Sequence, residues 1–140
     1  MNVPNIVRSA RLIMLDQDDY VFGFIRPLSA NQRGGDVDIS GGKIDANELP
    51  AEAARREFNE ETGVAVDGPI DYHYGVSERD GNTWFTREYF VTDQRINARD
   101  IKQLTEHIGM VCASQATIIE LTDCIPHQRA IGCLATSVVA

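Results

Sequence analysis

The segment from Pro50 to Gly63 is the most sharply bounded element of the sequence, and it constrains the fold most. Pro50 suits the first turn of an α-helix, where its missing N–H is not needed. Residues 51–62 are mostly good helix formers, and Gly63 can adopt the left-handed conformation that ends a helix. The sequence therefore predicts one well-defined helix, Ala51 to Thr62 with Pro50 in its first turn.

Three glutamates share one side of this predicted helix. At about 100° per residue, Glu57, Glu60 and Glu61 fall within one arc of roughly 100°, next to the arc that turns Ala54 and Phe58 towards the core. Carboxylates at these spacings repel one another by about 0.2–0.5 kcal/mol per exposed pair. The face is thus either solvated or neutralised by a hard divalent cation such as Mg²⁺, which prefers oxygen ligands.

Nine residues around the helix follow a fixed spacing. Gly is followed by five residues and Glu, then by seven residues, Arg-Glu-hydrophobic, any residue, Glu-Glu, any residue, Gly and a hydrophobic residue. These positions are Gly42, Glu48, Arg56, Glu57, Phe58, Glu60, Glu61, Gly63 and Val64. The string resembles the Nudix box at every specified position, which favours a metal site over a solvated face.

The resemblance implies a catalytic metal centre. Glu57, Glu60 and Glu61 are expected to bind Mg²⁺, with Mn²⁺ as a possible substitute, and the backbone carbonyl of Gly41 is an expected further ligand. The implied reaction is attack of water on one phosphorus of a pyrophosphate linkage, in which positioning and electrostatics dominate.

The remaining box residues are expected to be structural. Alongside Gly42 and Gly63, an ion pair between Glu48 and Arg56 would steady the loop against the helix and so orient the metal ligands. Ser40 departs from the family, whose members often have Pro before the paired glycines. We expect altered loop stiffness there, with the metal ligands intact.

Residues outside the box supply the expected base and substrate contacts. Family members draw the base from the box or from a later loop, so Glu106, in a polar stretch before a predicted strand, is the candidate. Glu88 and Glu120 are rivals, and each of the three could be an ordinary exposed acid. Arg26 and Arg33 could contact phosphates or could balance nearby acids.

Aromatic and histidine side chains are also candidates for binding. The aromatic residues of a predicted hairpin could stack on a base or pack in the core, and they are Tyr72, Tyr74, Trp84, Phe85 and Tyr89. The three histidines, His73, His107 and His127, are scattered, which favours surface or hydrogen-bonded roles over a metal site.

The flanking segments predict strands and two further helices. Strands 6–15 and 20–25 are expected to form a hairpin around turn residues 16–19, and a short strand 37–39 ends at paired glycines that tolerate positive φ. A second hairpin joins strands 70–76 and 83–92 through residues 79–82. The chain then continues with a loop 97–106, a strand 108–113 and helices 116–122 and 127–139, with Pro126 between the helices. The resemblance implies an α/β Nudix fold, a mixed β-sheet sandwiched between α-helices (an α/β/α sandwich), in one domain over residues 1–140.

Composition excludes several classes of protein. The net charge of −8 and the pI near 4.7 argue against a nucleic-acid partner, and no run of about 18 apolar residues predicts a membrane span. The start lacks a signal-peptide pattern, so a cytoplasmic location is expected. Cys112, Cys124 and Cys133 are expected to be reduced and mostly buried. A homodimer is possible, since homodimers are common among soluble enzymes.

The resemblance implies hydrolysis of a pyrophosphate bond in a nucleoside diphosphate derivative. Short relatives favour a nucleoside triphosphate, unmodified or oxidised, as the small-molecule substrate, with a monophosphate and pyrophosphate as products. The alternatives are a nucleotide conjugate (ADP-ribose, a nucleotide sugar or a dinucleoside polyphosphate) and a non-catalytic nucleotide sensor. A sensor should show erosion of Glu57, Glu60 and Glu61, and all three are present.

Overall fold

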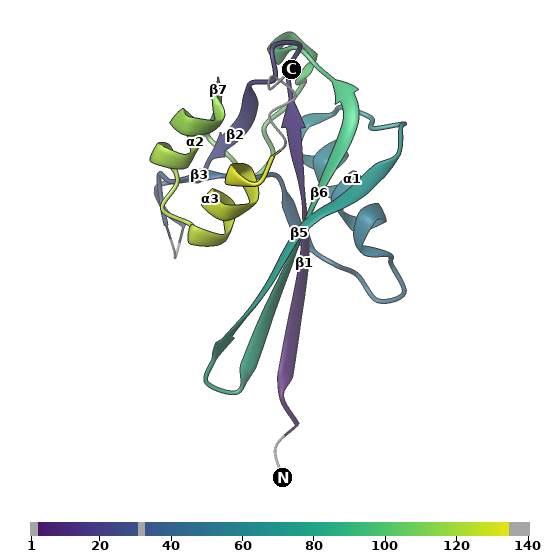
Figure 1. Ribbon diagram of the computed structural model, residues 1–140, viewed down its shortest axis with the longest axis vertical. Helices are drawn as coiled ribbons and strands as arrows, with labels where there is room; N and C mark the ends of the chain where they lie inside the picture. Colours follow the sequence, from purple (N-terminus) through teal and green to yellow (C-terminus); the bar gives the residue numbers. More distant parts are fainter. Residues whose placement is uncertain (1–2, 31–32, 135–140) are drawn as a thin grey trace.

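The computed structural model describes residues 3–30 and 33–134. Its elements, in chain order, are β1 (Asn5–Leu15), β2 (Val21–Ile25), β3 (Val37–Asp38), β4 (Gly41–Lys43), α1 (Pro50–Thr62), β5 (Ile70–Asp80), β6 (Thr83–Arg95), the 3₁₀ helix η1 (Ala98–Asp100), β7 (Gly109–Ala113), α2 (Gln115–Leu121) and α3 (Ile125–Gly132). The strands form one mixed sheet, with α1 on one side and α2 and α3 on the other (Figure 1). The expected sheet between helices is confirmed.

Strand β1 organises the sheet. The main path is β3-β2-β1-β6-β5, with β4 paired to β1 and β7 paired to β2. β1 runs parallel to β6 over most of its length, whereas β4 pairs with it in the antiparallel sense through Gly41 and Gly42. The first hairpin is confirmed only at its turn, where Leu15 pairs with Val21, because β2 then leaves β1 to pair with β7.

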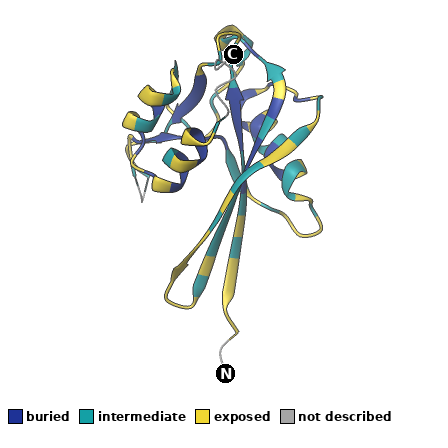
Figure 2. Ribbon diagram, viewed as in Figure 1, coloured by how far each residue is buried: buried dark blue, intermediate teal, exposed yellow. Residues whose placement is uncertain are grey.

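The core has two parts because β1 alternates its side chains between the two faces of the sheet. Leu12 and Met14 pack under α1 with Phe58, and Ile13 packs under α2 and α3 with Ile131. Both faces are therefore covered in the body of the molecule. Beyond the helices, β1, β5 and β6 continue as a largely exposed arm (Figure 2).

The sequence predicted α1 well and α3 poorly. α1 spans Pro50–Thr62, and Gly63 ends it with a left-handed φ of 75°. The prediction of a break at Pro126 was wrong, because α3 begins at Ile125 and holds Pro126 in its first turn, where proline is tolerated. The helix ends at Gly132, earlier than expected, and positions 135–139 of that prediction lie outside the described residues.

Two smaller points complete the fold. Cys124 is buried, Cys112 is partly buried and Cys133 is exposed, so the expectation of mostly buried thiols was wrong for Cys133. Across the described ranges, every helix is too short or too polar to traverse a lipid bilayer.

Candidate metal and substrate site

The three box glutamates of α1 differ sharply in exposure. Glu61 is buried, with 3% of its surface exposed, whereas Glu57 is partly buried and Glu60 is exposed. The reason is helical geometry, since Glu61 follows Phe58 by three residues and Phe58 packs in the core under α1. A buried glutamate is not a solvated surface charge, so the solvated-face alternative fails for Glu61.

Arg56 holds the outer glutamates. Its Nε and Nη2 donate to Glu48 at 2.8 and 3.1 Å, and its Nη1 donates to Glu57 at 3.0 Å and to Glu60 at 3.2 Å. The hydrogen bonds to Glu48 are the main reason that the pKa of Arg56 is raised, and Arg56 in turn lowers the pKa of Glu48. The expected ion pair between Glu48 and Arg56 is therefore present, and it ties the loop before α1 to the acidic face.

Gly41 and Gly42 bring β4 against both β1 and α1. A Cβ atom on Gly42 would lie 2.6 Å from a carboxylate oxygen of Glu57, and one on Gly41 would lie 2.3 Å from the carbonyl oxygen of Ala10. Neither glycine has a positive φ. The glycines, expected to end a strand with residues that tolerate positive φ, instead begin β4, and close approach is what requires them.

Burial sets the protonation of Glu61. It raises the pKa of Glu61 to about 7, although the Ser40 hydroxyl, which donates to Oε2 of Glu61, opposes the shift. The negative charge of Glu57 raises this pKa further, so the two carboxylates lie close enough to repel. The pKa of Glu57 is itself raised, first by burial and against the effect of Arg56.

Glu106 is the only one of the three outside candidates that we can connect to the box. It lies in the turn before β7 with a left-handed φ of 71°, and its charge contributes to the raised pKa of Glu57. Glu88 instead forms an ion pair with Arg8 at 3.1 Å, and Glu120 is exposed on α2.

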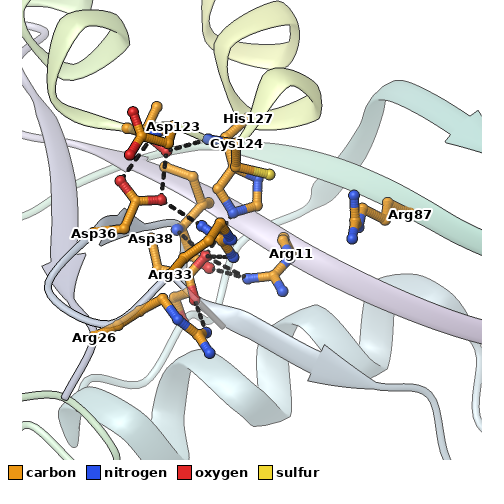
Figure 3. Close-up of polar contacts among 12 residues, drawn as sticks. Arg11, Arg26, Arg33, Asp36, Asp38, Arg87, Asp123, Cys124 and His127 are labelled. Carbon is orange, nitrogen blue, oxygen red and sulfur yellow. Dashed lines mark hydrogen bonds and ion pairs between the residues drawn. The ribbon is translucent and has the colours of Figure 1, made fainter. Parts of the chain in front are cut away.

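A second cluster surrounds Asp38, a carboxylate as buried as Glu61. Nη1 of Arg11 lies 3.1 Å from Oδ1 of Asp38, and Nη1 of Arg26 lies 3.2 Å from Oδ2 (Figure 3). Arg33 binds Asp36 at 2.6 Å and reaches Asp38 at 3.7 Å. The structure thus brings Arg26 and Arg33 together, and both are paired with carboxylates.

The pKa of Asp38 reflects these partners. Burial alone would raise it, but Arg11, the nearby His107 and a hydrogen bond from His127 hold it far below its usual range. Asp38 is therefore ionised near pH 7.

His127 extends this cluster into the core. It is fully buried on α3, and burial lowers its pKa to about 4, so it is neutral near pH 7. Its Nε2 lies 2.5 Å from Asp38, and its Nδ1 lies 2.5 Å from the Tyr89 hydroxyl. Because a carboxylate only accepts, we assign the proton to Nε2, and the Tyr89 hydroxyl then donates to Nδ1. Tyr89 is thus a core residue, whereas Tyr72 is exposed.

The sequence prediction missed Asp38 and Arg11. Each is a charged residue inside an apolar strand segment, Asp38 between Val37 and Ile39 and Arg11 within β1. Such a position implies burial and hence a partner of opposite charge, and that signal was available. The prediction of hydrogen-bonded roles is confirmed for His73 and His127, and His127 converges on Asp38 from 89 residues away.

Arg11 and His107 join the two clusters. Both favour the ionised form of Asp38 and of Glu61. Among the described residues, Arg11 Nε and His107 Nδ1 are the buried side-chain nitrogens that find no hydrogen-bond partner. Arg11 therefore acts on both carboxylates, and the hydrogen bonds of its Nη1 go to Asp38 and to the carbonyl oxygen of Ile39.

The carboxylates of α1 suit a hard divalent cation. Within residues 3–30 and 33–134, no three His, Cys, Asp or Glu side chains stand close enough together to form a ready-made metal cage. Mg²⁺ does not require one, since it commonly uses one or two carboxylates and completes its shell with water and phosphate oxygens. Glu57 and Glu61 could supply such oxygens, and the exposed Glu60 could add another, with Arg56 in contact with both Glu57 and Glu60.

Comparison with known proteins agrees with this description. A model of the NUDIX domain matches residues 7–122. The fold is similar to that of the MutT protein from Methanosarcina mazei Go1, with a TM-score of 0.79 and 19% identity over 94% of each chain. No curated protein sequence matches the chain significantly.

Two further solved structures share the fold. An Ap4A hydrolase from C. elegans gives a TM-score of 0.72 and 16% identity, over 90% of this chain and 93% of that one. The NUDIX domain of Shewanella oneidensis NrtR, solved with ADP ribose, gives a TM-score of 0.70 and 18% identity, over 94% of this chain and 86% of that one. The domain match includes the complete box and most of the sheet around it. The chain therefore belongs to the Nudix hydrolase family.

Proposed function

We propose that this protein hydrolyses a pyrophosphate bond in a nucleoside triphosphate, unmodified or oxidised, to give a monophosphate and pyrophosphate, with Mg²⁺ or Mn²⁺ as cofactor. One observation carries the proposal. Glu61 is buried beside Glu57 in a complete Nudix box, and burial raises the pKa of Glu61 to about 7 even though Ser40, His107 and Arg11 all lower it. A divalent cation would supply the missing charge.

We assign separate roles in metal binding and water activation to the site residues. Glu57, Glu60 and Glu61 would hold the metal with the carbonyl of Gly41, and Arg56 would have to release both Glu57 and Glu60 for this. When bound, Mg²⁺ would withdraw charge from the phosphate oxygens as the phosphorus is attacked. Glu106 is proposed to orient and deprotonate the attacking water, because its charge is felt at Glu57.

Arg26 and Arg33 are proposed to contact substrate phosphates. Their side chains are 26% and 27% exposed, so they reach solvent while bound to carboxylates. A guanidinium carries five N–H donors in a planar fork, and it can therefore bind a carboxylate and a phosphate oxygen at once.

Two alternatives remain as outcomes of the test. The C. elegans Ap4A hydrolase and the NUDIX domain solved with ADP ribose have the same fold, which supports a nucleotide conjugate as a second candidate substrate. A non-catalytic sensor is the third candidate, and the complete set of box glutamates argues against it.

The test is a panel of nucleotides incubated with the purified protein and Mg²⁺, with the products separated by chromatography. We expect a monophosphate and pyrophosphate from at least one triphosphate, and we expect a chelator to abolish the reaction. If only nucleotide conjugates are cleaved, the substrate is a conjugate and not a nucleoside triphosphate. Tight binding of one nucleotide with no phosphate-containing product would contradict hydrolysis and favour the sensor.

A further inference from the structure

Ser40 stands where relatives often have Pro, and it lies between the two elements that build the site. It is fully buried between β3 and β4. Its backbone carbonyl accepts a hydrogen bond from the Leu12 N–H of β1 at 2.9 Å. Its hydroxyl donates to Oε2 of Glu61 on α1. Ser40 thus connects the central strand directly to the buried carboxylate.

Glu61 is held from its backbone side as well. Its carbonyl oxygen accepts from the Thr105 N–H at 3.0 Å, in the loop that leads to Glu106. Two residues beyond Ser40, the absence of a side chain at Gly42 leaves room for the carboxylate of Glu57. One short segment, residues 40–42, therefore lies against both carboxylates that we assign to the metal.

We propose that Ser40 is a positioning residue for the metal centre, and that its hydroxyl occupies one oxygen of Glu61 so that the other is directed to the cation. This inference rests on the proposed function, because it assumes that Glu61 binds metal. Proline has neither hydroxyl nor N–H, so a relative with Pro at this position cannot make the contact. Ser40 is therefore a feature of this chain, beyond the specified positions of the box.

Physical chemistry gives the expected size of the effect. A buried carboxylate without its hydrogen bond can turn to other rotamers, so the metal must then select the competent one. Removing a group that orients a metal ligand typically costs about 10–100-fold in metal affinity or activity. A purely structural hydroxyl would change stability and leave metal affinity unchanged.

The test is Mn²⁺ binding to the metal-free protein, followed by electron paramagnetic resonance, for wild type, Ser40→Ala and Ser40→Thr. We expect Ser40→Ala to weaken Mn²⁺ binding about 10-fold or more, and Ser40→Thr, which keeps the hydroxyl, to bind more tightly than Ser40→Ala. Thr92→Val, which alters a buried hydroxyl on β6, is the matched control and should bind as wild type does. If Ser40→Ala does not fold, Ser40→Cys takes its place, because a thiol is close in size and only a weak donor.

The outcomes separate this inference from the proposed function. If Glu61→Gln abolishes Mn²⁺ binding while Ser40→Ala binds as wild type does, Ser40 is structural and only the present inference is wrong. If wild-type protein binds no Mn²⁺, the inference and the proposed metal centre are both wrong.

Discussion

Glu61 and Asp38 are two equally buried carboxylates with opposite electrostatics. Their exposed fractions are 3% and 4%, yet the pKa of Glu61 is raised to about 7 and that of Asp38 is far below its usual range. Three arginines and two histidines lie around Asp38, whereas the direct partner of Glu61 is the uncharged Ser40 hydroxyl.

The difference indicates which of the two buried carboxylates is neutralised by the side chains of the protein itself. Burying an ionised carboxylate is costly unless it is paired, and the chain pairs Asp38 fully. Glu57 pairs with Arg56, whereas among the described residues the direct side-chain partner of Glu61 is only the Ser40 hydroxyl, so a full counter-charge for Glu61 is left to come from outside. We infer that Asp38 is a structural centre and that Glu61 belongs to a binding site.

The largest expected effect is on stability, from Asp38→Asn. The substitution keeps the size of the side chain but leaves the largely buried Arg11 side chain, which is 14% exposed, without its counter-charge. We expect a loss of about 3–5 kcal/mol in the free energy of unfolding, measured with urea. Asp71→Asn, at an exposed position on β5, should change it by less than about 0.5 kcal/mol. A loss below about 1 kcal/mol for Asp38→Asn would mean that the cluster is not a structural centre.

Glu61→Gln should have the opposite effect to Asp38→Asn, with a large loss of activity and no loss of stability. It removes a proposed metal ligand, so kcat/KM should fall by more than about 100-fold, beyond the cost of losing a residue that only supports a ligand. Above about pH 7 the metal-free variant should be at least as stable as wild type, because a raised pKa means that folding disfavours the ionised form. Glu120→Gln is the control for both measurements. Activity within a few fold of wild type would remove Glu61 from the site.

Tyr89→Phe tests how far the Asp38 centre extends. It removes the hydroxyl that donates to His127 and leaves a buried imidazole nitrogen unpaired, which should cost about 1–3 kcal/mol of stability. Tyr72→Phe, at an exposed tyrosine, should be nearly neutral by the same denaturation measurement. Equal stability of the two variants would show that the chain from Tyr89 to Asp38 contributes little.

The smallest effect is the pH dependence of metal binding. A folded-state pKa of about 7 means that Glu61 becomes protonated as pH falls through 7, and a metal must then displace the proton. We expect Mg²⁺ affinity, measured by calorimetry, to be roughly constant above about pH 8 and to fall by up to about tenfold per pH unit below 7. The fall should be absent in Glu61→Gln. An affinity unchanged between about pH 8 and pH 6 in wild type would contradict the raised pKa.

Sequence patterns predicted structure formed by residues close in sequence, but they predicted little of the cluster around Asp38. The helix, its stop at Gly63 and the pairing of Glu48 with Arg56 depend on residues close in sequence, so spacing was enough to predict them. Arg11 and Asp38 are 27 residues apart, and they meet because β4, which follows Asp38, pairs with β1 and places Gly41 opposite Arg11. The inward turn of Glu61 likewise depends on how α1 packs on the sheet, which periodicity alone does not specify.

We infer that a divalent metal ion supplies the counter-charge that Glu61 lacks. The most direct measurement is calorimetric titration of Mn²⁺ into metal-free wild type, Glu61→Gln and Glu120→Gln at about pH 8, without nucleotide. We predict that wild type and Glu120→Gln bind alike and that Glu61→Gln binds at least about 100-fold more weakly. Equal Mn²⁺ affinity in all three proteins would contradict the claim.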